Sequence, residues 1–145
     1  MAKFAQGKYT LKYPEKYGGN KTPTYRSSWE WAFMQFCDNH PSVIQWASES
    51  IQIPYKNPLT GKASIYVPDF LVVYQDRRGN KNAELIEVKP KKETTMENAG
   101  KSQVTRARVV VNMAKWEAAN RWCKQNSIRF RVVTEDDIFH GSKKR

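Results

Sequence analysis

Three apolar segments, at about residues 43–54, 65–74 and 83–89, are rich in Ile, Val, Tyr and Trp and follow one another along the chain. Short polar segments at residues 57–61 and 76–80 join them. Segments of this composition are typical of β-strands, and such short connections make neighbouring strands antiparallel. A chain with this pattern is therefore expected to contain a sheet that other elements must cover.

A helix is predicted before the strands, at residues 26–39, because apolar residues recur there at the spacing of one helical face. His40 and Pro41 end it, since the residue before a proline avoids helical geometry. The apolar face carries Trp29, Ala32, Phe33, Phe36 and Cys37.

A second, longer helix is predicted at about residues 103–125, followed by a strand at 128–133 and a short capped turn at 134–137. The segment from residue 90 to 102 is polar and is expected to form a surface loop. The order helix, three strands, helix, strand predicts an α/β fold in which helices flank a small mixed sheet. The apolar face of the second helix comprises Val104, Ala107, Val111, Ala114, Ala118 and Trp122.

Charge points to the kind of partner. In 145 residues, Lys and Arg number 25 and Asp and Glu number 14, which gives a net charge of +11 and predicts a polyanionic partner. No apolar run is long enough for a membrane span, and the N-terminus lacks a secretory signal, so a reducing cytoplasm is expected. Cys37 and Cys123 are then predicted to be buried thiols.

The first 25 residues show no helical or strand period and are expected to form a basic arm, before a domain at residues 26–140 and a disordered basic tail at 141–145. Within the arm a Lys-Tyr pair recurs every four residues, at 8–9, 12–13 and 16–17. Such pairs suit a contact with phosphates and bases. The interpretation that we favour is a surface arm held in place by its tyrosines.

The charged residues near the strand ends form the candidate site. Glu87 and Lys89 point to one face of their strand, while Ile86 and Val88 point to the other and belong to the core. A turn centred on Arg78 places Asp69 opposite Glu87, and a turn centred on residue 79 places it opposite Lys89. Either register keeps the three charges on one face. Two carboxylates that close together favour a divalent cation with oxygen ligands, such as Mg²⁺.

Glu30 extends this pattern because it lies at the border of the apolar face of the first helix, from where it can reach over the sheet. Together, Glu30, the pair Pro68-Asp69 and the triplet Glu87-Val88-Lys89 resemble the motif of the PD-(D/E)XK nuclease superfamily. Residues 25–30 and 129–138 are similar to the TnsA-type transposon end-cleaving nucleases. The chain as a whole is similar to the head completion nucleases of T-even-type bacteriophages, in particular at residues 1–3, 26–30 and 38–41.

The resemblance implies a restriction-endonuclease-like core and hydrolysis of DNA phosphodiesters with Mg²⁺ or Mn²⁺. Asp69 and Glu87 would hold the metal, Glu30 would hold it or its water from the helix side, and Lys89 would stabilise developing charge. His40 and His140 are expected to be structural or solvated. Both endonuclease and exonuclease activity fit this site.

DNA, bound with little sequence specificity, is the expected partner. The resemblance further implies action on packaged DNA in the host cytoplasm during phage assembly or in the virion head, with head or portal proteins as partners and no cofactor beyond the metal. A non-enzymatic protein that binds DNA ends or a capsid vertex is the alternative; an RNA-binding sheet is disfavoured because its stacking aromatics are missing. The candidate DNA-binding residues are Arg26, Gln103, Arg108, Lys115, Arg77, Arg78, Lys91 and Lys92.

Overall fold

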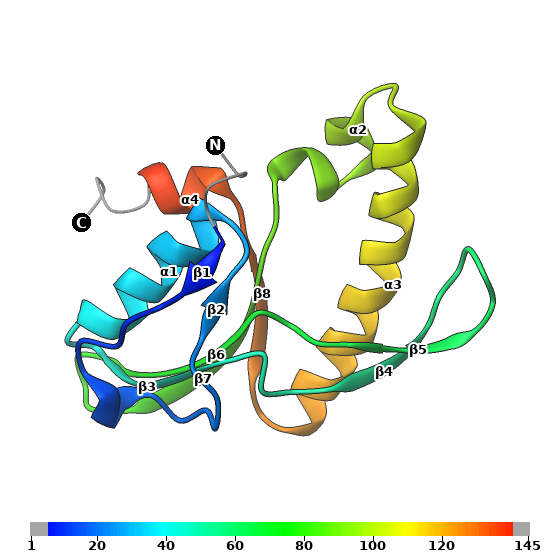
Figure 1. Cartoon of the computed structure of the whole chain (residues 1–145). Helices are drawn as coiled ribbons and strands as arrows, with labels where there is room; N and C mark the ends of the chain where they lie inside the picture. The colour runs from blue at the N-terminus through cyan, green and yellow to red at the C-terminus, as the bar shows by residue number, and fades with distance from the viewer. Residues whose placement is uncertain (1–5, 141–145) are drawn as a thin grey trace.

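A mixed sheet lies at the centre of the computed structural model, which describes residues 6–140 and the side chains of residues 6–137. Its strands are ordered β3 (Val43–Ser48), β6 (Phe70–Gln75), β7 (Lys81–Val88) and β8 (Arg129–Val133) (Figure 1). The β3–β6 and β6–β7 pairs are antiparallel, and β7–β8 is parallel. This confirms the predicted α/β class and mixed sheet. The tail at 141–145 and the side chain of His140 lie outside the described residues.

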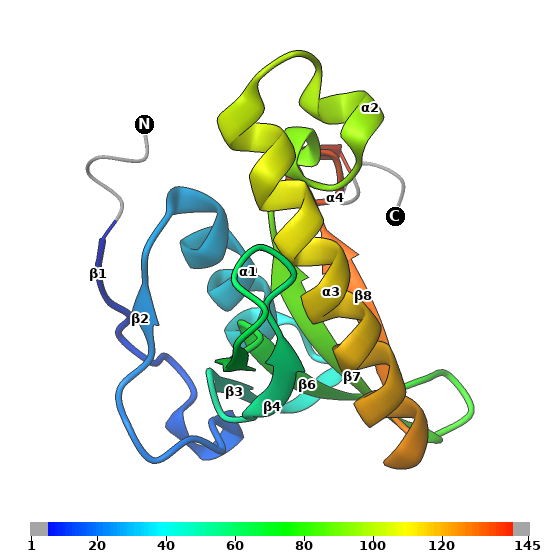
Figure 2. The ribbon, with the colours of Figure 1, turned by 90° about the vertical axis from the view of Figure 1, so that its right-hand side faces the viewer.

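Two of the predicted strands are each divided in the structure. The first continues beyond β3 as β4 (Ile53–Lys56), and the second begins as β5 (Ala63–Tyr66) before β6. At the first division Glu49 has a φ of 51°, a left-handed conformation that a strand cannot continue. β4 and β5 pair with each other as a separate hairpin that contacts the long helix and projects beside it (Figures 1 and 2).

Helix α1 (Ser28–Asn39) begins at Ser27, whose side chain accepts a hydrogen bond from the backbone N–H of Glu30. Its buried face is rotated from the predicted one: Phe36 is 39% exposed, whereas Met34 and Asp38 are fully buried. The N-terminal segment covers this flank of the helix, and the periodicity of α1 itself carries no information about that cover.

Helix α3 (Gln103–Gln125) has the predicted bounds, but its buried face also differs from the predicted one. Val104 is 63% exposed. The predicted loop before α3 contains two short helices, η3 (Lys91–Glu93) and α2 (Met96–Ala99), and Asn112 donates a hydrogen bond to the backbone carbonyl of Glu93. Neither α3 nor any other described helix is both long and apolar enough to cross a membrane. The buried residues of α3 are Thr105, Val109, Asn112, Ala118, Ala119 and Cys123.

Helices cover both faces of the sheet. On one face α1 packs with Phe70, Val72 and Ile86, and on the other α3 packs with Leu85. Strand β7 is therefore enclosed from both sides. Cys37 lies in the first of these cores and Cys123 in the second, which confirms both as buried thiols.

The last helix, α4 (Glu135–His140), contacts α1. It opens with the expected capping arrangement, in which the Thr134 hydroxyl accepts from the N–H of Asp136 while Asp137 accepts from the N–H of Thr134.

The described part of the N-terminal arm lies against the domain. Strand β1 (Gly7–Lys8) pairs with β2 (Thr24–Tyr25), and η2 (Pro14–Lys16) lies between them. Tyr9 is 4% exposed and belongs to the core, and the ring centroid of Tyr17 lies 4.8 Å from that of Trp46. The structure thus favours the arm held in place by its tyrosines.

Candidate active site

Asp69 and Glu87 lie at the same end of the β6–β7 hairpin. The strands pair Phe70 with Ile86, and one further step along this register places Asp69 opposite Glu87, as a turn centred on Arg78 predicts. At this end of the strand pair the Asp69 side chain replaces a backbone acceptor: its Oδ2 accepts a hydrogen bond of 2.7 Å from the backbone N–H of Val88. Alternation along the strands places both carboxylates on the face that α3 covers.

This face is buried, contrary to the expectation that the charged pair lies outside the core. Glu87 is only 5% exposed because α3 and the β4–β5 hairpin cover it. Burial raises the pKa of Asp69 well above its usual value, and the charges of Glu87 and then Glu30 raise it further. Burial also raises the pKa of Glu87, against the opposing effect of Lys89.

Two ammonium groups approach Glu87. Lys89 Nζ lies 3.7 Å from Glu87 Oε2, and the backbone N–H of Lys89 donates to the carbonyl of Val133 on β8. Lys115, from α3, lies 5.6 Å from the centroid of the Tyr66 ring and lowers the pKa of Glu87. Lys89 is therefore held beside the carboxylates by its own strand, and Lys115 approaches from the helix.

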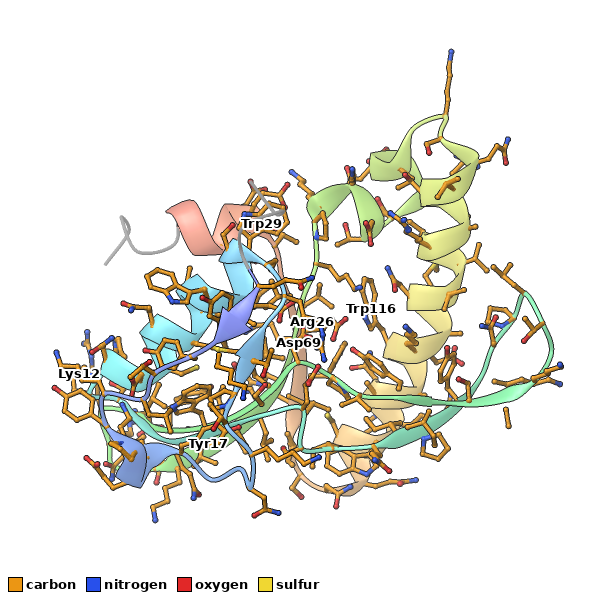
Figure 3. All side chains as sticks on the ribbon, in the orientation of Figure 1. Lys12, Tyr17, Arg26, Trp29, Asp69 and Trp116 are labelled. Carbon is orange, nitrogen blue, oxygen red and sulfur yellow. The ribbon has the colours of Figure 1, made fainter. Side chains whose placement is uncertain are left out.

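Glu30 reaches the site from the first turn of α1. Its Oε1 accepts a hydrogen bond from the backbone N–H of Arg26, and burial raises its pKa. The Arg26 guanidinium pairs with Glu49, whose backbone N–H donates to the carbonyl of Asp69. Figure 3 shows Arg26 and Asp69 close together between α1 and α3. A chain of contacts thus connects the start of α1 to the start of β6.

The donor set suits a divalent cation, although its ligands are incomplete. Among the described residues, no three His, Cys, Asp or Glu side chains are placed to hold a metal ion, so Glu30 does not complete a set with Asp69 and Glu87. Glu87 Oε1 is buried and finds no hydrogen-bond partner in the described structure. An orphaned carboxylate oxygen beside a second carboxylate fits a hard cation with oxygen ligands.

Comparison with known proteins identifies the family. Residues 40–135 match the model of the TnsA-like endonuclease N-terminal family. The chain belongs to this endonuclease family. It is also 36% identical, over 142 residues, to a protein of Enterobacteria phage T4 named head completion nuclease, a match that covers 91% of this chain and 92% of that protein. Asp69, Glu87 and Lys89 fall within the region that matches the family, and Glu30 precedes it.

Four of the candidate DNA-binding residues lie near the acidic pair or on α3. Arg26 is bound to Glu49, and Arg108 Nη1 lies 3.4 Å from Glu93 Oε2. Lys115 approaches Glu87, as described above, and Gln103 is exposed at the first position of α3.

The other four candidates differ in their distance from the site. Lys91 Nζ lies 3.2 Å from Asp136 Oδ2, and Lys92 is exposed in the same short helix just after Lys89. Arg77 and Arg78 lie in the turn at the far end of the β6–β7 hairpin. Arg77 lies eight positions after Asp69, so the two residues are at most about 26 Å apart.

Sequence reasoning missed three residues of this site: Glu49, Tyr66 and Trp116. Tyr66 is 3% exposed, and neither its hydroxyl nor Trp116 Nε1 has a hydrogen-bond partner within the described structure. Burial raises the pKa of Tyr66, and the nearby charge of Glu87 raises it further. Tyr66 reaches Glu87 because the β4–β5 hairpin packs against α3, where Trp116 lies beside Tyr66, and no local sequence signal indicated this packing.

Proposed function

We propose that this chain is a divalent-metal-dependent deoxyribonuclease that acts in bacteriophage head completion, where it processes packaged DNA before heads and tails join. The observation that carries the proposal is the convergence of Asp69 and Glu87 at one end of β6 and β7, with Lys89 Nζ 3.7 Å from Glu87. Membership of an endonuclease family supports the hydrolytic activity.

The residues divide the chemistry between them. Asp69 and Glu87 would hold Mg²⁺ or Mn²⁺, which when bound polarises a phosphoryl oxygen and lowers the pKa of an attacking water. The ammonium of Lys89 would bind the scissile phosphate and stabilise the charge that develops on it. Glu30, whose charge raises the pKa of Asp69, would orient a water from the helix side. No side-chain nucleophile is required.

The biological setting rests on the T4 relative, whose name gives it a role in head completion. We extend that role to this chain, with DNA as substrate and head or portal proteins as partners during assembly in the host cell. The net charge of +11 supports binding along a DNA backbone without sequence readout.

Cleavage of supercoiled plasmid in the presence of Mg²⁺ or Mn²⁺ tests the proposal. Wild-type protein is expected to nick or linearise the plasmid, EDTA to prevent this, and Lys89→Ala to lower the rate at least a hundredfold. Lys81→Ala is the matched control, because Lys81 lies on the same strand at its opposite, exposed end. Equal rates for Lys89→Ala and wild type would refute the catalytic role.

The same assay separates the proposal from a non-enzymatic protein that binds DNA ends or a capsid vertex. Such a protein would bind DNA in a salt-sensitive way and leave it intact with either metal. Comparison of circular with end-labelled linear DNA then distinguishes endonuclease from exonuclease activity, since only the former acts on a molecule without ends.

A further inference from the structure

A groove of about 610 Å³ lies beside the candidate active site, between the tip of the β4–β5 hairpin and α3. Lys89 lines it and also lies 3.7 Å from Glu87, so the groove opens directly onto the catalytic residues. Leu59 of the hairpin tip and Val104 and Val111 of α3 are among its apolar lining residues. In Figure 2 the hairpin projects toward the viewer alongside α3.

The hairpin tip is a structured turn that leaves an apolar side chain exposed. Asn57 Oδ1 accepts a hydrogen bond from the N–H of Leu59, the Thr60 hydroxyl accepts one from the N–H of Lys62, and Gly61 adopts a φ of +73°. These contacts fix the tip, yet Leu59 remains 58% exposed. The ordered tip therefore presents an apolar side chain to solvent at a defined position beside the groove.

The wall of the groove formed by α3 also has an exposed apolar side chain. Val104 is 63% exposed at the start of α3, although the helix has other residues for its buried face. The groove thus has solvent-exposed apolar side chains on both sides.

Cations complete the lining of the groove. Lys89, Arg108 and Lys115 contribute three positive charges, and Glu93 is its single acidic lining residue. Arg108 Nη1 lies 3.4 Å from Glu93 Oε2, but the ammonium groups of Lys89 and Lys115 face the groove beside the carboxylates. The occupant should therefore carry both negative charge and apolar surface.

We propose that this groove binds an unpaired DNA strand, and that the preferred substrate of the nuclease is a DNA end with a single-stranded tail. The inference rests on the proposed nuclease function. In a duplex the base faces are stacked and only edges and phosphates are accessible. An unpaired strand instead offers its base faces for apolar contact with Leu59 and Val104, while its phosphates contact the lysines. Known single-strand-binding grooves likewise contact both the backbone and the base faces, the latter through aromatic side chains.

Binding measured without metal tests this inference separately from cleavage. Fluorescence anisotropy in EDTA compares one labelled duplex with blunt ends and the same duplex with a ten-nucleotide tail. Wild-type protein is expected to bind the tailed DNA about tenfold more tightly. The double variant Leu59→Ser/Val104→Ser is expected to lose most of this preference while it retains its affinity for blunt DNA.

Two exposed apolar residues outside the groove provide matched controls. Ile65, 53% exposed on β5, and Met113, 57% exposed on α3, are absent from the groove lining, so Ile65→Ser/Met113→Ser should retain the preference for tailed DNA. Thermal unfolding checks that both double variants fold.

Two outcomes would overturn the inference. The first is equal binding of tailed and blunt DNA by the wild type, and the second is an equal loss of both affinities in the groove variant, which would identify a duplex contact instead. Neither outcome would affect metal-dependent plasmid cleavage. Failure of that cleavage would refute the proposed function itself.

Discussion

Asp69 has an unfavourable position in the metal-free protein, because burial and the charges of Glu87 and Glu30 all disfavour its ionised form. Replacement by asparagine removes the charge and retains an oxygen that can accept from the N–H of Val88. We expect Asp69→Asn to stabilise the metal-free protein by about 1 to 2 kcal/mol at pH 8, as is common where a functional site opposes stability. Urea unfolding in EDTA measures the change.

The stability gained by Asp69→Asn is expected to increase with pH. A carboxyl group whose pKa is raised in the folded state adds stability below its unfolded pKa and loses that contribution as the pH rises through the folded pKa. The advantage of Asp69→Asn over wild type should therefore be small near pH 4 and grow toward pH 8. Asp76→Asn, the same change in the exposed turn at the other end of the hairpin, should show no such growth. A difference in the free energy of unfolding between Asp69→Asn and wild type that does not change with pH would contradict the inference that burial and charge repulsion raise the pKa of Asp69.

At the residue scale the carboxylate pair was predicted from the sequence. Alternation of side chains along a strand and a short polar turn allow only a few pairing registers between the two strands. Of the two registers considered, the one centred on Arg78 occurs. Glu49 and Tyr66 could not be predicted in the same way. Glu49 has a left-handed backbone and forms an ion pair with Arg26. Tyr66 reaches Glu87 because a separate hairpin packs beside the site. Both depend on contacts between segments that are distant in sequence.

Among the elements, the N-terminal arm depends on one buried carboxylate. Asp38 is fully buried on α1 and accepts hydrogen bonds from the Tyr9 hydroxyl and from the backbone N–H groups of Lys12 and Tyr13. Tyr9→Phe removes one of these three donors from a buried acceptor. It is expected to lower the free energy of unfolding by about 1.5 to 3 kcal/mol, the usual range for a hydrogen bond to a charged group.

Tyr13→Phe is the matched control, since the Tyr13 side chain is 39% exposed and only its backbone contacts Asp38. Chemical denaturation should show little change for this variant. Equal effects of the two substitutions would mean that the Tyr9 hydroxyl does not hold the arm. Removal of residues 1–20 should be more severe than either, because it also exposes Trp46 beneath Tyr17.

The bounds of the two long helices were easier to predict than the faces that they bury. Ser102 and Asn126 at the ends of α3 are local signals, and the predicted range is the observed one. Which face is buried depends on what covers it. Asp38 is buried under the arm, and Asn112 is buried where it bonds to the carbonyl of Glu93. Neither residue lies on the apolar face that the periodicity of its helix predicts.

Over the whole molecule, positive charge extends well beyond the catalytic end of the sheet. The chain from Asp69 to Arg77 spans at most about 26 Å, which corresponds to at most roughly eight base pairs of B-DNA at 3.4 Å each. Lys92, in contrast, lies three residues after Lys89. If duplex DNA runs along the β6–β7 hairpin, its length determines which of these cations it contacts.

The dependence of DNA affinity on salt measures those contacts, because each phosphate neutralised adds about 0.9 to the slope of log K against log salt. On a 30-base-pair duplex, Arg77→Gln/Arg78→Gln should reduce the slope by about 2, whereas on a duplex too short to reach from the catalytic end to the turn it should have no effect. Lys92→Gln should reduce the slope by about 1 on both. An unchanged slope for the arginine variant on the long duplex would show that DNA leaves the catalytic end in another direction, and would remove Arg77 and Arg78 from the DNA-binding surface.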